Sequence, residues 1–338
     1  MNEGVVVVSK EIGGRTLSLE TGRIGRQANA SVVCRYGDTM VLSAVTMAPM
    51  AREGADFFPL TVDYREPQYA AGKFPGGFFK REGRPSEKEI LTSRCIDRPM
   101  RPLFPDGFRN EVQVQLKVFS YDRENDPDIC AMIAAFASME ISDVPFSGPI
   151  GAVRIGRNDG QFVINPTNPQ METGTVNLTI AGTRDAINMV EGGAKEEPEE
   201  VILQALDLAQ EVIREVCGLV GELKQKCGKP KLPFDPPVVD EKLQARVREL
   251  AYERIKAAHV IPEKLERQSA LDAVLAEVKL QVLTEMEAGF HAAIARGEIT
   301  AGDLDARVQH KKQLAESEKQ IAILVHDLER EILRRRTL

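Results

Sequence analysis

The chain has 338 residues, of which 43% are hydrophobic and 28% are charged, and its formal net charge is −7 at pH 7. This length suits two or three domains, and the acidic balance argues against a protein that coats nucleic acid with its whole surface, so any such contact must come from a local basic patch. Five cysteines without CxxC spacing argue against a disulfide framework or a zinc site, and the lack of an apolar signal segment or of a run of about 18 apolar residues leads us to expect a cytoplasmic protein without a membrane span.

The first 65 residues predict β-structure. Apolar or alternating runs that suit strands lie at 4–8, 16–19, 30–35, 39–46 and 57–64. The third and fourth runs flank Tyr36, Gly37 and Asp38, which predict a hairpin turn. A loop rich in glycine follows at 70–83.

A helix is predicted directly after this loop. Ser86 suits its N-cap and Glu89 lies three residues later, which is the capping-box pattern. We expect the helix to end near Asp97 or Arg98, because Pro99 lacks an N–H donor and disfavours helical geometry in the residue before it.

The segments that follow predict the rest of an α+β core. Residues 111–119 alternate between apolar and polar types, which predicts a half-buried strand. Asp126 and Pro127 open a helix expected to run to about 142, and its small apolar residues predict burial. Four more strands are expected at 151–155, 161–164, 176–181 and 187–190, and a long amphipathic helix at 196–226. This order predicts an α+β core in residues 1–228 and not a doubly wound sheet.

The composition changes after this core. Residues 229–237 contain four prolines and predict a linker. From 238 to 338 the apolar residues recur with helical spacing, so we expect an all-helical domain of three or four helices.

One segment of this acidic chain is basic. Between 73 and 101 it holds eight Lys and Arg residues against four Asp and Glu residues, a local charge of +4. Within it Phe78 and Phe79 lead directly into Lys80 and Arg81, and Arg84 follows. Rings that stack on bases and cations that meet phosphates suit a single-stranded nucleic acid. The alternatives are a solvated charged loop and helix, or two phenylalanines of the core.

Several segments together carry a resemblance to a known family. They are 57–62 (FFPLTV), 78–87 (FFKREGRPSE), 97–105 (DRPMRPLFP), 110–114 (NEVQV) and 148–152 (GPIGA). Through them the chain resembles the N-terminal part of bacterial polynucleotide phosphorylases over essentially its whole length. The resemblance implies a ribonuclease-PH-like core (ribosomal protein S5 domain 2-like) followed by an all-α domain. In that family a second core and then KH and S1 domains come next, and we expect the catalytic second core to be absent from this chain.

The resemblance also implies an activity and partners. The family degrades single-stranded RNA from its 3′ end by phosphorolysis, in which inorganic phosphate attacks the terminal phosphodiester and a nucleoside diphosphate leaves. Its members are homotrimers that use Mg²⁺, whose carboxylate ligands we expect in the absent second core. We expect no membrane partner and no DNA partner, and the sequence does not indicate whether degradosome proteins bind.

Two groups of residues receive roles from the resemblance. Phe78, Phe79, Lys80, Arg81 and Arg84 match the family's RNA-binding loop at the narrow mouth of the trimer channel.

Arg94 and Arg98 match family arginines that help to bind the substrate phosphates, and their spacing of four residues places them on one helix face. The alternative for Arg94 is a surface ion pair with Asp97. Arg101 is expected to be structural.

Catalytic and metal-binding groups are expected to be absent. The positions that align with the family's acid pair hold Met171 and Asn177, and the position of a following lysine holds Thr179. The family's serine-rich phosphate turn is replaced by residues 125–128 (NDPD), where carboxylates repel phosphate and Asp126 suits a helix cap. We therefore expect no catalytic residue and no metal site in this chain, and no activity from it in isolation. The alternatives are a non-catalytic module for RNA binding and trimer assembly, or one regulated by a nucleotide or polycarboxylate.

Overall fold

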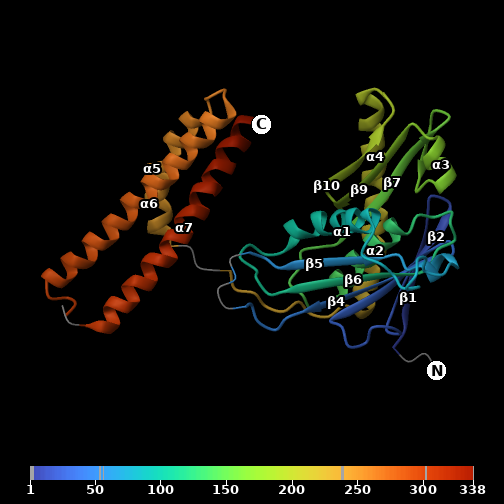
Figure 1. Cartoon of the computed structure of the whole chain (residues 1–338), viewed down its shortest axis with the longest axis horizontal. Coiled ribbons are helices and arrows are strands. Elements are labelled where there is room, and N and C mark those ends of the chain that lie inside the picture. Colours follow the sequence, from blue (N-terminus) through green and yellow to red (C-terminus); the bar gives the residue numbers. More distant parts are fainter. Residues whose placement is uncertain (1–3, 53–54, 56, 237–239, 301–302, 338) are drawn as a thin grey trace. The chain divides into compact units, whose positions relative to one another are not determined.

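The computed structural model describes residues 4–52, 55, 57–236, 240–300 and 303–337. The chain divides into two compact units, residues 1–236 and 237–338, each with its own core (Figure 1). The boundary predicted at 237–238 lies outside the described residues.

The first unit contains a six-stranded sheet. Its strands are β1 (Val6–Ile12), β2 (Arg15–Thr21), β3 (Ala30–Tyr36), β4 (Thr39–Met47), β5 (Leu60–Arg65) and β6 (Val112–Ser120). Their order is β1-β2-β3-β4-β6-β5, and every pair is antiparallel except β5 with β6. The predicted hairpin joins β3 to β4 through Gly37, whose φ of 61° is a value that glycine adopts without strain.

A second sheet has four strands. They are β7 (Ile150–Asn158), β8 (Gln161–Ile164), β9 (Val176–Thr183) and β10 (Ile187–Ala194), in the order β10-β9-β7-β8 and antiparallel throughout. A short helix that the sequence did not predict, α3 (Asn168–Thr173), connects β8 to β9.

Helices α2 (Pro127–Ile141) and α4 (Glu199–Cys227) join the two sheets. Every residue of α2 is buried, because the helix packs against β3, β4 and β6 of one sheet, β7 of the other, and α4. Its almost wholly apolar sequence follows from contact on all sides. The α+β architecture predicted for this unit is confirmed.

Helix α1 (Glu87–Met100) begins as predicted and ends later than predicted. The capping box is present, since Ser86 Oγ accepts the N–H of Glu89 and the Glu89 carboxylate accepts the N–H of Ser86. The expectation that Pro99 ends the helix at 97–98 is wrong. Pro99 removes one hydrogen bond, but it is buried beside Met100, and Asn188 Nδ2 donates to the Pro99 carbonyl at 3.0 Å. Tertiary packing therefore outweighs the local preference.

The proline-rich segment predicted as a linker lies against the first unit as far as Phe234. Lys229 N–H donates to the Ile141 carbonyl at 3.0 Å and Leu232 N–H donates to the Asp143 carbonyl at 2.7 Å. The Phe234 ring lies 5.3 Å from that of Phe108. These contacts satisfy backbone groups beyond the end of α2, so residues 229–236 belong structurally to the first unit.

The second unit contains three helices within its described residues. They are α5 (Glu241–Ala258), α6 (Lys264–Ala295) and α7 (Leu304–Thr337). Val247, Ile255, Val278 and Ile321 lie at the centre of their shared core. No helix in the described ranges combines the length and the apolar character needed to cross a bilayer.

Candidate functional site

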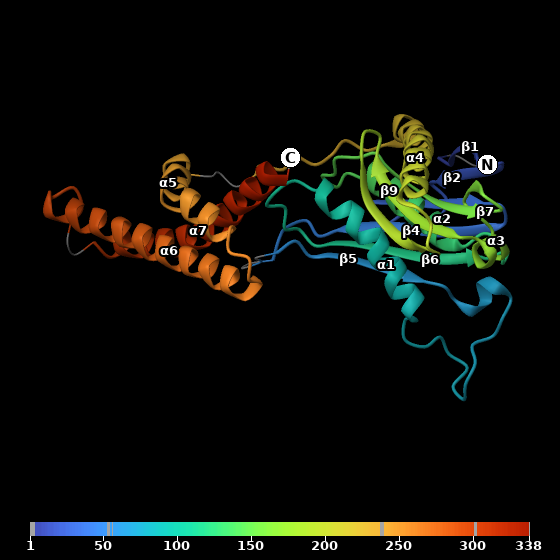
Figure 2. The same ribbon diagram turned by 90° about the horizontal axis from the view of Figure 1, so that it is seen from above.

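The loop between η1 (Gln68–Ala71) and α1 leaves the body of the first unit as a long excursion (Figure 2). Phe78 and Phe79 lie on it with 93% and 81% of their surface exposed, and their ring centroids are 5.5 Å apart in an edge-to-face arrangement. The alternative that these are core residues is therefore wrong. Lys80, Arg81 and Arg84 are exposed on the same loop.

The base of this loop is fastened on both sides. The Gln68 N–H donates to Glu82 Oε1 at 2.8 Å, and Arg65 Nη2 donates to the Gly83 carbonyl at 2.8 Å. The Tyr121 N–H, at the end of β6, donates to the Ala70 carbonyl at 2.9 Å. Exposed rings are thus presented on a segment whose two ends are held.

Lys80 has a left-handed backbone conformation, with φ of 49°. This region is uncommon for residues other than glycine and costs on the order of 1–2 kcal/mol. The turn at Lys80 directly follows the phenylalanine pair and precedes Arg81. The same conformation occurs at Arg123, Asp159, Asn165 and Glu196, so by itself it does not distinguish this loop.

The arginines of α1 differ in their exposure and in their ion-pair partners. Asp97 pairs with Arg101 (Nη2 to Oδ1, 2.7 Å), so the alternative in which Arg94 pairs with Asp97 is wrong. Arg94 is exposed, whereas Arg98 Nη1 lies 2.6 Å from Glu191 Oε2 on β10. Arg101 also donates to two main-chain carbonyls near β5, at 3.1 and 3.3 Å, which agrees with a structural role.

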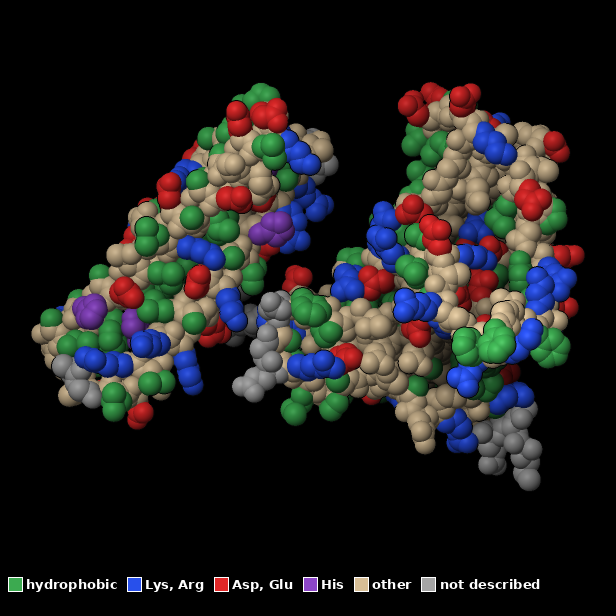
Figure 3. Space-filling model, viewed as in Figure 1, with side chains coloured by type: hydrophobic (Ala, Val, Ile, Leu, Met, Phe, Trp, Pro, Cys, Tyr) green, Lys and Arg blue, Asp and Glu red, His purple; other side chains and the backbone are tan. Residues whose placement is uncertain are grey.

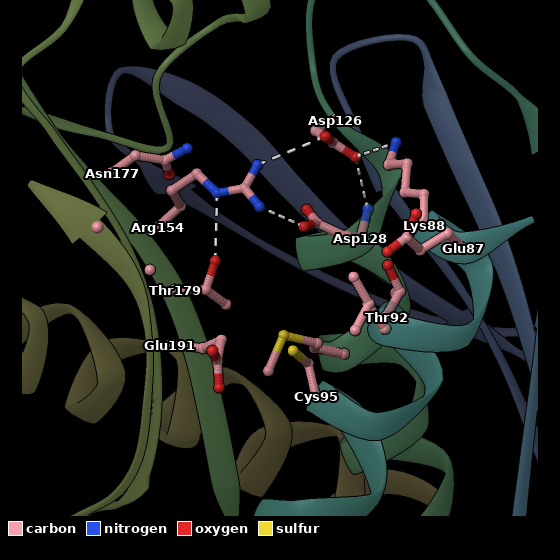
Figure 4. Close-up of a pocket in the computed structure, with 14 residues that line it drawn as sticks. Glu87, Lys88, Thr92, Cys95, Asp126, Asp128, Arg154, Asn177, Thr179 and Glu191 are labelled. Carbon is pink, nitrogen blue, oxygen red and sulfur yellow. Dashed lines mark hydrogen bonds and ion pairs between the residues drawn. The ribbon is translucent and has the colours of Figure 1, made fainter.

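A pocket of about 470 Å³ lies between α1, the start of α2 and strands β7, β9 and β10 (Figure 4). Arg154 of β7 projects into it and is only 9% exposed. Its Nη2 donates to Asp128 Oδ2, its Nη1 lies 3.6 Å from Asp126 Oδ2, and its Nε donates to Thr179 Oγ1 at 3.3 Å. Lys88 of α1 pairs with Asp126 at 3.0 Å. Lys88 also pairs with Glu66 at 3.0 Å, so three carboxylates and two cations form one cluster.

The two departures from the family pattern meet in this pocket. Asp126 and Asp128 of the turn 125–128 lie opposite Asn177, aligned above with an acid position, and Thr179, aligned with the lysine position (Figure 4). Met171 Sδ, at the other position aligned with an acid, is 3.1 Å from Arg154 Nη1. Asp126 also caps α2, as predicted.

Sequence reasoning missed Arg154, which connects these groups. The available signal was a lone cation in the apolar run 150–155, at a position where burial is expected on both faces of the strand.

The two carboxylates differ in their proton affinity. Burial raises the pKa of Asp128 to about 6, assisted by the nearby Asp126 charge and opposed by Arg154. Burial also acts on Asp126, but the charges of Lys88 and Arg154 outweigh it and lower the pKa of that carboxyl. Because Arg154 and Lys88 already pair with these carboxylates, a divalent cation would have to displace them, so the pocket does not suit Mg²⁺, whose ligands the resemblance places in a second core. Within the described ranges, no group of three or more His, Cys, Asp or Glu side chains is placed to hold a metal ion.

Charged side chains of both signs are mixed over the visible face of the first unit, with no continuous basic field (Figure 3). This distribution agrees with the acidic net charge of −7. A polyanion contact must therefore be local.

Comparisons with known proteins give a consistent result. Residues 13–145 match domain 1 of the 3′ exoribonuclease family, and residues 148–212 match domain 2. The polyribonucleotide nucleotidyltransferase of Chloroflexus aggregans is 53% identical over 274 residues, which cover 81% of this chain and 36% of that protein. The same enzyme of Geobacillus kaustophilus is 51% identical over 282 residues, and that of Geotalea uraniireducens is 47% identical over 280 residues. These matches cover 83% of this chain and 38% and 40% of the respective relatives.

The chain thus spans well under half the length of the curated relatives it matches. A crystal structure of rice (Oryza sativa) Rrp46 is similar with a TM-score of 0.47 and 14% identity, over 66% of this chain and 95% of that chain. A likeness this weak does not bear on function.

Proposed function

The chain belongs to the 3′ exoribonuclease family and corresponds to the N-terminal part of polyribonucleotide nucleotidyltransferases, and we propose that it serves 3′-to-5′ phosphorolysis of RNA as the half that guides and holds the substrate. In this reaction inorganic phosphate attacks the 3′-terminal phosphodiester and a nucleoside diphosphate leaves. A second core would complete the enzyme in a homotrimer and would supply the Mg²⁺ that stabilises the developing negative charge.

The observation that carries this proposal is the exposure of Phe78 and Phe79 beside three cations. An exposed ring stacks on any base, for roughly 1–3 kcal/mol per base, so the contact tolerates every sequence, as a general RNA-degrading enzyme requires. Lys80, Arg81 and Arg84 are exposed around the rings and are free to meet the phosphates of the same strand. Arg94 and Arg98 would help to bind the reacting phosphates from the exposed face of α1.

We expect the isolated chain to be inactive, and Arg154 supports that expectation. The guanidinium lies among Asp126, Asp128 and Thr179, where its charge satisfies the carboxylates. With Asp126 and Asp128 already paired, neither carboxylate is open to a metal ion, and the negative charges of both disfavour phosphate.

A phosphorolysis assay combined with RNA binding tests the proposal. The purified chain is mixed with labelled oligo(A), phosphate and Mg²⁺, and diphosphate release is followed beside RNA retention on a gel. We expect retention without release. The triple variant K80A/R81A/R84A should lose retention, and the slope of log K against log salt should become shallower by about 0.7 for each phosphate contact removed.

The matched control removes three exposed cations from the second unit, as R307A/K311A/K312A, and should retain RNA. Diphosphate release by the isolated chain would show that it has a catalytic site. Equal loss in both triple variants would show that net charge, and not this loop, governs binding.

A further inference from the structure

A third phenylalanine lies on the loop that carries Phe78 and Phe79. Phe74 is 93% exposed, as much as Phe78, and no role was predicted for it above. Single exposed apolar residues are ordinary, whereas several on one segment, as with Phe74, Phe78 and Phe79, mark a binding surface.

Phe74 is exposed even though the first unit has an aromatic core. Five other phenylalanines of the first unit form a connected cluster with ring centroids 4.5 to 5.9 Å apart: Phe58, Phe104, Phe108, Phe146 and Phe234. The loop rings are kept out of this cluster because their segment is fastened at Ala70, Glu82 and Gly83 and projects away from the sheet (Figure 2).

The surroundings of Phe74 repeat those of the phenylalanine pair. Lys73 precedes Phe74 and is exposed, as Lys80 and Arg81 are exposed after Phe79. A ring beside a cation suits a nucleotide, whose base stacks while its phosphate meets the charge. Phe74 and Phe78 are four residues apart, so their Cα atoms lie at most about 14 Å from each other. One short stretch of single-stranded RNA can contact both rings.

We propose that Phe74 is a third base-stacking residue, so that the loop holds single-stranded RNA through two separate aromatic platforms, Phe74 and the Phe78–Phe79 pair. This inference rests on the proposed RNA-guiding function and extends it to a residue outside the recognised loop motif. The occupant is RNA and not an apolar protein surface, because each platform adjoins an exposed cation.

The chain contains no tryptophan, which provides a direct test. Single-tryptophan variants F74W, F78W and F57W of the full chain are titrated with a 12-nucleotide oligo(A), with fluorescence and anisotropy recorded together. Phe57 is 68% exposed and lies outside the loop, so it is the matched control. Stacking on a base should quench the F74W and F78W signals, and the F57W signal should not change.

Affinity measurements complete the test. F74A should weaken binding about 5- to 150-fold with an unchanged salt slope, because a neutral ring releases no counterions, and F74W should restore affinity. If F74W is silent while F78W is quenched, the Phe74 proposal fails and the proposed function stands. If anisotropy shows no binding in any variant, RNA guiding fails and the Phe74 proposal fails with it. A protein-concentration dependence of the F74W signal without RNA would assign the ring to self-association and overturn the proposal.

Discussion

Arg154 illustrates how much a single buried charge constrains this fold. It lies on β7 and is paired with two carboxylates at the start of α2. A buried ion pair adds little net stability, because each charge loses its hydrating water. Removal of one partner, however, leaves the other charge unpaired in a poorly solvated site. We therefore expect the cluster to affect stability chiefly when one of its members is removed.

We predict that R154M lowers the free energy of unfolding by about 3–5 kcal/mol, because Asp128 and Asp126 are left buried with only Lys88. Urea unfolding followed by circular dichroism measures the loss. R98M is the control, since its pair with Glu191 is exposed and worth about 1 kcal/mol or less. The double variant R154M/D128N should recover part of the loss, and equal stability of R154M and wild type would contradict the role given to this cluster.

The proton affinity of Asp128 gives a second prediction at this scale. Its pKa in the folded chain is about 6 against an ordinary 3.8, so its contribution to stability is full below about 4 and is lost as pH rises through 6. The pKa of Asp126 is lowered, so its contribution is present above 3.8 and is lost as pH falls. D126N should lower the pKa of Asp128, because the Asp126 charge raises it.

The Asp128 carboxyl-carbon shift in an NMR titration measures this change, and D97N serves as a control at a carboxylate that pairs with Arg101. An unchanged Asp128 midpoint in D126N would show that the two groups titrate independently.

At the scale of elements, the loop that we propose to bind RNA depends on an acid. Glu82 is one of the few negative charges in the basic segment, and its carboxylate accepts the N–H of Gln68 at the other end of the loop. A negative charge opposes RNA binding, so its presence there is explained by the hydrogen bond that holds the loop base.

We predict that E82A weakens RNA binding even though it removes a negative charge, because the loop base opens and its rings lose their orientation. E82Q should keep or improve binding, since the amide oxygen can still accept the Gln68 N–H. E87A is the matched control: it removes an exposed acid at the first turn of α1, and binding should stay equal or rise. Fluorescence anisotropy with oligo(A) distinguishes these signs, and stronger binding by E82A would show that only its charge matters.

At the scale of the whole molecule, each unit has its own apolar core. Residues of α5, α6 and α7 make up the second core, and none of the buried residues of the first core belongs to them. Separate cores in compact units predict separate unfolding transitions.

We predict that I321A lowers the stability of the helical unit by about 2–5 kcal/mol and leaves the first unit unchanged, because Ile321 is fully buried in the core that α5, α6 and α7 share and its truncation leaves a cavity. I133A, in α2, is the reciprocal control and should shift only the unfolding transition of the first unit. Differential scanning calorimetry resolves the two, and a joint shift in either variant would show that the units unfold as one.

The sequence by itself determined the features that depend on near neighbours. The alternation of residues 111–119 was enough to predict the buried face of β6, and the Ser86–Glu89 capping box was enough to place the start of α1. Both features depend on residues two or three positions apart, so the residue types at these spacings are enough to predict them. The basic aromatic segment was recognisable for the same reason.

Only the tertiary structure decided what depends on distant residues. Pro99 stays inside α1 because Asn188 and the core hold that turn, and the segment that starts at Lys229 docks because its N–H groups find acceptors at Ile141 and Asp143. The pocket assembles from Asp126, Arg154 and Thr179, which approach one another only when the second sheet closes against α2. The residues next to a charge in a strand do not indicate which distant residue it will pair with. The energy of such a pair arises only after folding has excluded water from both charges.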